Sequence, residues 1–289
     1  MSDKFVQKKI IVGGCSFTFG NELSDDVGGH TPSKKTWAYR LANQTSPTST
    51  YVCAAMPGSG NCGIARRVYT EISKYPPEEI KGVAVMWTFL SRYDWAMPRH
   101  KHLEDTRWAT ISPWDTSMRD DERHNALAGS EIQTNLWNKR NDLMIETGVR
   151  PFAEAIYKHA ANEYHETYLS WKSIIWLQNI LEKKNIKYMF TLADNSLFYK
   201  DFKPHKDQDR FMSALYDEID FTNWFSFGER MMGFNQWALM NEYERGTTHP
   251  LDKAHEDAIM SVSYTHLRAH ETPEHRVWRL RRGKKNGGG

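Results

Sequence analysis

Three short apolar runs, each followed by a turn of small and polar residues, constrain the fold of this chain most strongly. They are residues 8–14 (KKIIVGG), 49–56 (STYVCAAM) and 82–89 (GVAVMWTF). Their length and β-branched content are typical of buried strands. The third run is apolar on both faces, as strands of parallel sheets are. Between the runs, in residues 36–43 and after Asn61, apolar residues recur at helical spacing. The chain therefore alternates strand and helix as α/β proteins do.

The pattern is interrupted and then resumes. Residues 92–150 are rich in tryptophan, histidine, aspartate and arginine and contain few periodic runs, so we interpret them as an insertion. From about Pro151 to Lys184 the pattern is helical, and the apolar residues from Tyr168 to Leu181 recur every three or four positions, which predicts a helix packed against a sheet. Residues 186–193 (IKYMFTLA) predict a fourth strand.

Residues 218–225 are a candidate edge strand, and a last helix is expected after His249 and Pro250. We therefore predict a single domain over residues 1–261, with the insertion at about 92–150. The expected fold class is α/β, a three-layer α/β/α sandwich with a four- or five-stranded parallel sheet.

The slightly basic balance of the chain comes from residues 262–289. This segment holds seven Lys or Arg and two Asp or Glu, out of 38 and 36 in the whole chain, which leaves 31 basic and 34 acidic residues in 1–261. Residues 262–272 (VSYTHLRAHET) resemble one reading frame of a sequencing-library adapter, so we expect 262–289 to be a non-native, disordered tail. The alternative is a genuine basic tail for anionic partners.

These numbers also bound the partners. Without the segment the chain is slightly acidic, which gives no basis for nucleic-acid binding. No apolar run approaches the roughly 18–20 residues of a membrane span, and the N-terminal residues lack a signal-peptide pattern. We expect a cytoplasmic protein with no membrane partner, and we make no prediction of its oligomeric state.

The loops after the predicted strands are where chemistry is expected, because open parallel sheets bind ligands at the carboxyl ends of their strands. In residues 14–20 (GCSFTFG) the hydroxyl of Ser16 lies on a turn between glycines that leads into a helix. Residues 57–61 (PGSGN) form a second turn whose backbone amides can face an anion. Ser16 could instead be a helix N-cap, and Asn61 a cap or turn residue.

These loops resemble the sequence blocks of the SGNH (GDSL-type) hydrolases, in particular uncharacterised members from phage and marine metagenomes, which also suits a viral origin. GCSFT matches the first block, Gly-x-Ser-x-Thr, and implies that Ser16 is the nucleophile. Gly58 takes the place of the glycine whose amide, with that of Ser16, forms the oxyanion hole. HPLDKAH resembles the last block and implies that His249 is the general base. The fold of this family, similar to flavodoxin, is the predicted sandwich.

Two positions depart from the family pattern. The family has an aspartate three residues before the catalytic histidine, where this chain has Gly246, so either a backbone carbonyl or another carboxylate must orient the imidazole. A literal DxxH occurs at Asp252 and His255, which makes His255 an alternative base. The family's asparagine after the third strand is also missing, and a hydroxyl of Thr88 or Ser91 could complete the oxyanion hole in its place.

Further candidate substrate contacts are Arg92, which could meet an anionic group, Asn61 and Trp87. The aromatic richness around the insertion suits a glycan, so the expected partner is a small-molecule or glycan ester. His100 and His102 have no third ligand at a suitable spacing, and we expect no metal and no other cofactor.

The resemblance implies a serine esterase, or acyl hydrolase, that acts on an ester or an acetylated carbohydrate. Ser16 attacks the carbonyl, and water resolves the acyl-serine intermediate. The alternative is a catalytically degenerate protein of the same fold that binds a glycan or a protein partner, which the missing aspartate and asparagine favour.

Overall fold

The computed structural model describes residues 7–97, 108–199 and 210–269. Its main sheet is built from parallel strands β1 (Lys9–Gly13), β2 (Thr50–Cys53), β3 (Ile80–Trp87) and β6 (Tyr188–Leu192). Their order in space is β2-β1-β3-β6, so β2 and β3 lie on opposite sides of β1 and β6 follows beside β3. The carboxyl ends of β1 and β3 therefore border the crevice where an open α/β sheet binds ligands.

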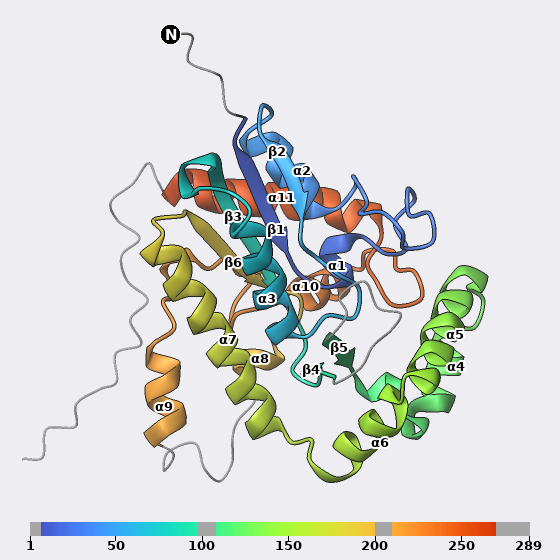
Figure 1. Ribbon diagram of the computed structural model, residues 1–289. Helices are drawn as coiled ribbons and strands as arrows, with labels where there is room; N and C mark the ends of the chain where they lie inside the picture. Colours follow the sequence, from blue (N-terminus) through green and yellow to red (C-terminus); the bar gives the residue numbers. More distant parts are fainter. Residues whose placement is uncertain (1–6, 98–107, 200–209, 270–289) are drawn as a thin grey trace, which may run out of the picture.

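Helices cover both faces of the sheet (Figure 1). Alternate side chains of β3 point to opposite faces, as the period of a strand requires. Val83 and Val85 pack with α3 (Asn61–Ile72) and α7 (Glu163–Lys183). Ala84 and Met86 belong to the other core cluster, which includes residues of α2 (Trp37–Thr45), α10 (Phe234–Met240) and α11 (Asp252–Ala269). The predicted three-layer α/β/α sandwich is confirmed, with four strands in the described sheet.

The prediction of an edge strand at 218–225 is wrong, apart from one bridge between Trp224 and Phe190. A 3-10 turn, Phe221–Asn223, begins where the Asp220 carboxylate accepts hydrogen bonds from Thr222. Only Trp224 then bridges to Phe190 of β6 in a parallel sense. The 3-10 turn thus occupies residues that were expected to form the edge strand. Short helices α8 (Ser196–Tyr199) and α9 (Arg210–Asp217) lie before it in the chain.

The insertion is more regular than its sequence suggested. It contains an antiparallel pair, β4 (Tyr93–Ala96) and β5 (Trp108–Ile111), and helices α4 (Asp120–Leu127), α5 (Glu131–Glu146) and α6 (Val149–His159). It also contains the 3-10 turns Pro113–Asp115 and Ser117–Arg119, and a further 3-10 turn, Pro77–Glu79, precedes β3. The ribbon and helices share a small core of their own, which includes Tyr93, Ile111, Met144 and Ala153.

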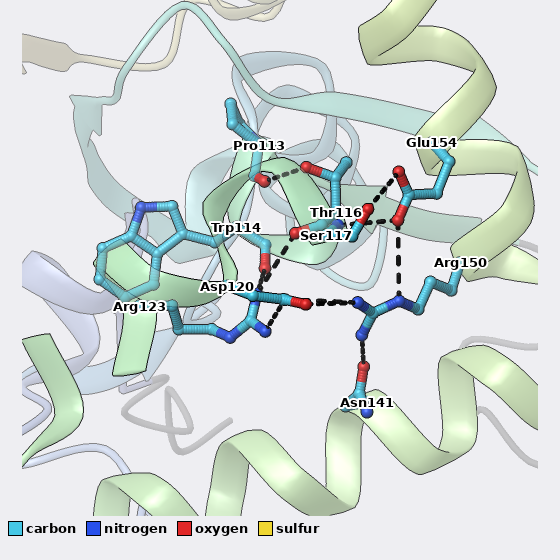
Figure 2. Close-up of polar contacts among 9 residues, drawn as sticks. All are labelled: Pro113, Trp114, Thr116, Ser117, Asp120, Arg123, Asn141, Arg150 and Glu154. Atoms are coloured by element: carbon cyan, nitrogen blue, oxygen red, sulfur yellow. Dashed lines mark hydrogen bonds and ion pairs between the residues drawn. The ribbon is translucent and has the colours of Figure 1, made fainter. Parts of the chain in front are cut away.

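Polar contacts supplement this small core, because α4 and α5, unlike α6, have little apolar periodicity (Figure 2). The Asp120 carboxylate at the start of α4 bonds the guanidinium groups of Arg123 and Arg150, and Arg150 Nη2 lies 3.3 Å from Asp120 Oδ1. Glu154 of α6 accepts hydrogen bonds from the backbone and hydroxyl of Ser117 at 2.7 and 3.2 Å. These helices are held by charge pairs that an apolar-pattern analysis does not register.

Helix α11 continues to Ala269, eight residues into the segment that we expected to be disordered. Neither glycine nor proline occurs between Asp252 and Ala269, so nothing in the local sequence stops the helix. Residues 270–289 lie outside the described part of the chain. Among the described residues, no helix is both long and apolar enough to cross a membrane.

Candidate active site

The site is built around Ser16, at the carboxyl end of β1. The strand ends at Gly13, and Ser16 is the first residue of the four-residue helix α1 (Ser16–Phe19). Cys15 is the N-cap, so the alternative reading of Ser16 as the cap is wrong. The Ser16 residue is only 8% exposed. A hydroxyl on this strand-to-helix turn faces the crevice that the sheet order defines.

His249 meets Ser16 from the distant end of the chain. Its Nε2 lies 2.7 Å from Ser16 Oγ, across 233 residues of sequence. The imidazole packs edge-on against the ring of Phe17, with centroids 4.8 Å apart, and the residue is 9% exposed. The structure therefore brings together the two residues that the sequence analysis paired as nucleophile and base, at a distance that allows direct proton transfer.

Glu22, which the sequence analysis did not identify, completes this arrangement. Its Oε2 lies 3.0 Å from Nδ1 of His249 and accepts the backbone N–H groups of His249 and Thr248 at 2.9 and 3.0 Å. The hydroxyl of Thr248 lies 2.8 Å from the same Nδ1. A carboxylate on Nδ1 holds the tautomer in which Nε2 accepts a proton from Ser16.

The electrostatics of Glu22 favour its charged form. The side chain is 8% exposed. Burial raises the pKa of Glu22, but its hydrogen bond to His249, the charge of that histidine and the two backbone N–H groups outweigh burial, so the pKa lies below its ordinary value. Glu22 therefore stays ionised at neutral pH and can stabilise an imidazolium.

Gly246 makes room for this carboxylate. It occupies the position where the resembling family has aspartate, and a Cβ there would lie 2.7 Å from Glu22 Oε2. The backbone N–H of Gly246 donates to the carbonyl of His249 at 2.9 Å, which ties the loop together. The missing aspartate is thus replaced in space by Glu22, which reaches the imidazole from the loop after α1.

His255, the alternative base, does not approach Ser16. It is 1% exposed, its Nδ1 accepts the backbone N–H of Trp37 at 3.2 Å, and its ring packs on Phe234. Burial, followed by electrostatic interaction with His249, lowers the pKa of His255 to about 3. Asp252 instead bonds Ser24 and Lys35. His255 is a neutral core residue, because its ring is enclosed by the Trp37 backbone and Phe234, while Asp252 at the first turn of α11 is engaged with Ser24 and Lys35.

Gly58 forms a turn beside the loop that carries Ser16. Its φ of 77° requires the left-handed region that glycine adopts most readily, and the N–H of Ser59 closes the turn on the carbonyl of Met56 at 3.2 Å. The N–H of Met56 donates to the carbonyl of Gly14 at 3.1 Å, so this turn is tied to the loop that carries Ser16. Its glycine amide remains the candidate second donor of an oxyanion hole.

Thr88 is not available as a third oxyanion donor. The residue is fully buried, and its hydroxyl donates to the Sγ of Cys15 at 3.2 Å. Trp87, a candidate substrate contact, is also fully buried and packs edge-on against Phe190, because it belongs to the core-facing side of β3. Both expectations are wrong because these two residues at the end of β3 belong to the interior: the Trp87 ring packs in the core, and the Thr88 hydroxyl is engaged with Cys15.

Asn61 links two strand-end loops. Gly60 is the N-cap of α3, so Asn61 is its first residue and not its cap. The Asn61 amide accepts the N–H of Thr88 at 2.8 Å and donates to the Thr88 carbonyl and the Ser170 hydroxyl at 3.2 and 3.0 Å. With 2% exposure it cannot contact a substrate as we expected. It holds the loop after β3 in place.

The remaining candidates from the sequence are Arg92, the histidines considered as metal ligands, and the tryptophans of the insertion. Arg92 lies on the site wall and is considered below. Among the described residues, no group of three or more His, Cys, Asp or Glu side chains is arranged to hold a metal. His100 and His102 lie outside the described ranges. Trp95 and Trp108 of the ribbon are 44% and 37% exposed, so aromatic surface is present near the end of β3.

Comparison with known proteins gives structural neighbours only. No family model and no curated protein matches the chain. Among solved structures, an esterase from Pseudoalteromonas sp. is 12% identical, with coverage of 92% of this chain and 100% of that chain and a TM-score of 0.42. An acetyl xylan esterase from Butyrivibrio proteoclasticus is 10% identical (93% and 66%, TM-score 0.40). A GDSL-like lipase from Bacteroides thetaiotaomicron is 11% identical (92% and 89%, TM-score 0.36).

Proposed function

We propose that the chain is a serine ester hydrolase of the SGNH type, in which Ser16, His249 and Glu22 form a catalytic triad. The observation that carries the proposal is the 2.7 Å contact between Ser16 Oγ and His249 Nε2, continued on the other side of the ring by Glu22 at 3.0 Å. This order of nucleophile, base and orienting carboxylate is the one that activates a serine hydroxyl at neutral pH.

The reaction follows from these contacts. Ser16 Oγ attacks the ester carbonyl while its proton passes to Nε2 of His249. The N–H groups of Ser16 and Gly58 donate to the developing oxyanion. Nε2 then protonates the leaving alcohol, and water, deprotonated by the same nitrogen, releases the acid from the acyl-serine. Glu22 stays ionised throughout and stabilises the imidazolium.

Labelling with a fluorophosphonate probe tests the proposal directly, because the probe reacts with an activated serine. We expect the wild-type chain to be labelled and Ser16→Ala not to be. Glu22→Gln loses a charge-assisted hydrogen bond, which corresponds to labelling that is about 10- to 100-fold slower. His249→Gln should abolish labelling.

His255→Gln is the matched control, since it makes the same substitution at the histidine that does not touch Ser16. It should still be labelled. Labelling that persists in Ser16→Ala, or that His255→Gln abolishes in a folded protein, would contradict the triad. A folded wild-type chain that is not labelled at all would favour the alternative, a degenerate member of the fold that binds a glycan or protein.

A further inference from the structure

Arg92 is a partly buried cation with no acidic partner in the described part of the chain. Its Nη1 donates to the carbonyl of Ser59 and to the hydroxyl of Thr88, both at 3.2 Å, and its guanidinium lies 4.9 Å from the ring centroid of Phe89. Its Nε and Nη2 form no hydrogen bond with any described residue. Arg140, by contrast, is paired with Asp115. Partly buried arginines without such a pairing are candidates to receive an anionic ligand.

The contacts of Arg92 place it next to both parts of the proposed oxyanion hole. Ser59, whose carbonyl it binds, directly follows Gly58. Thr88, its other partner, contacts Cys15, which directly precedes Ser16. The guanidinium thus lies between the turn of the second strand and the turn of the first, on one wall of the site.

A line of aromatic rings connects the same guanidinium to the base. The ring of Phe89 lies 6.0 Å from that of Phe17, and Phe17 lies 4.8 Å from the imidazole of His249. Phe89 is only partly buried. Phe17 is 4% exposed, so the partly exposed ring of Phe89 supplies the apolar surface between the base and the guanidinium.

The position of Arg92 is fixed by its backbone. A Cβ at Gly60 would lie 2.7 Å from the carbonyl oxygen of Arg92 and 3.0 Å from its Cβ, so only glycine at position 60 allows this approach. The next residues of the chain form β4, whose Asp94 accepts the N–H of Gly63 at 2.7 Å. The start of β4 is thereby packed on the first turn of α3, which fixes the backbone position of Arg92.

We propose that Arg92 binds an anionic group of the substrate, so that the enzyme prefers esters whose acyl or alcohol part carries a carboxylate. This inference rests on the proposed esterase function and names its substrate class. The planar guanidinium with unused donors matches a carboxylate in geometry and charge, and the apolar ring of Phe89 separates that charge from the reacting carbonyl.

Two matched pairs of esters test the preference. For the acyl part, mono-4-nitrophenyl succinate is compared with 4-nitrophenyl pentanoate. For the alcohol part, 4-acetoxybenzoate is compared with its methyl ester. In each pair the ratio of kcat/KM for the anionic ester to that for the neutral one is measured in the wild type, Arg92→Gln and Arg92→Lys. We expect one pair to show a ratio that falls about 10- to 100-fold in Arg92→Gln and less in Arg92→Lys.

Arg119→Gln serves as the control, because it removes an exposed arginine from the insertion and should leave both ratios unchanged. The wild-type preference should also weaken as salt is raised. If both ratios are the same in wild type and Arg92→Gln, or if Arg92→Gln lowers all four activities equally, the proposal is wrong and Arg92 only holds the Ser59 turn. A wild type that neither labels nor hydrolyses any ester would instead refute the esterase function itself.

Discussion

Replacing Gly246 by alanine tests the triad without touching any of its members. The added Cβ would lie 2.7 Å from Glu22 Oε2, whereas ordinary van der Waals contact begins at 3.4 Å, so the two atoms must separate by about 0.7 Å. That oxygen is held by three hydrogen bonds of 2.9 to 3.0 Å, all from the loop that contains residue 246. Relief by moving the carboxylate stretches these bonds, including the one to His249 Nδ1.

The expected cost follows from that displacement. Misplacing a catalytic group by about 1 Å can cost about 100-fold in rate. For a smaller shift of the orienting carboxylate we expect kcat/KM for a simple acetate ester to fall roughly 10- to 100-fold, or about 1.4–2.7 kcal/mol of transition-state stabilisation. Gly82→Ala is the control, since a Cβ there meets only the carbonyl of Lys187 at 3.4 Å.

A double-mutant cycle makes the test specific. In Glu22→Ala the oxygen that the new methyl group meets is gone, so adding Gly246→Ala should change the remaining activity little. The two losses would then be strongly non-additive, as expected for groups in contact. If Gly246→Ala is as active as the wild type, or if it costs the same factor in the Glu22→Ala background, the carboxylate does not act through this contact.

Three further predictions concern stability. The pKa of His255 falls from 6.5 to about 3 on folding, so below pH 6.5 the unfolded chain binds a proton that the native chain does not. Urea unfolding should therefore show about 2 kcal/mol less stability at pH 5 than at pH 7 from this group. His255→Gln should reduce this dependence of stability on pH. An equal slope in the variant would argue against a neutral core histidine. Asn61→Leu should cost about 2–3 kcal/mol, since it leaves the buried N–H and carbonyl of Thr88 unpaired; a loss under 0.5 kcal/mol would mean that this link is not needed. Arg140→Ala should lower the free energy of unfolding by about 1–3 kcal/mol, because the 1% exposed Asp115 carboxylate keeps only its Ser112 partner. Hydrogen exchange in this variant should rise in α4–α6 before it rises in the main sheet, and a uniform rise would contradict an insertion that is stabilised separately.

The sequence predicted the elements whose apolar pattern records their burial. The runs around Ile11 and Val85 became β1 and β3, because both faces of these strands are covered and their residues alternate between two cores, and the run around Val52 became the partly exposed edge strand β2. The loops after them followed from the general position of ligand sites in parallel sheets. Ser16 and His249 were found in this way, although the distance between them was not predictable from spacing.

Glu22 could not be predicted, because its role depends on a contact across 227 residues and on a backbone φ of 68° that its sequence does not signal. Only the glycine at position 246, in place of a side chain, hinted that a group from elsewhere fills that space. Trp87 and Thr88 were misplaced because a strand's last residues look alike whether they enter the core or face the crevice. The charge-paired helices α4 and α5 were missed since they have little apolar periodicity.

The distribution of the triad along the chain bears on how activity is acquired during folding. Ser16 and Glu22 lie in one short segment, while His249 arrives only when the segment before α11 packs against the α2 side of the sheet. Closing a loop of more than 200 residues is a late and entropically costly step compared with forming the neighbouring β1–β3 pairing. Appearance of esterase activity should therefore lag behind formation of the sheet in refolding experiments, so that the reaction itself reports the docking of α11.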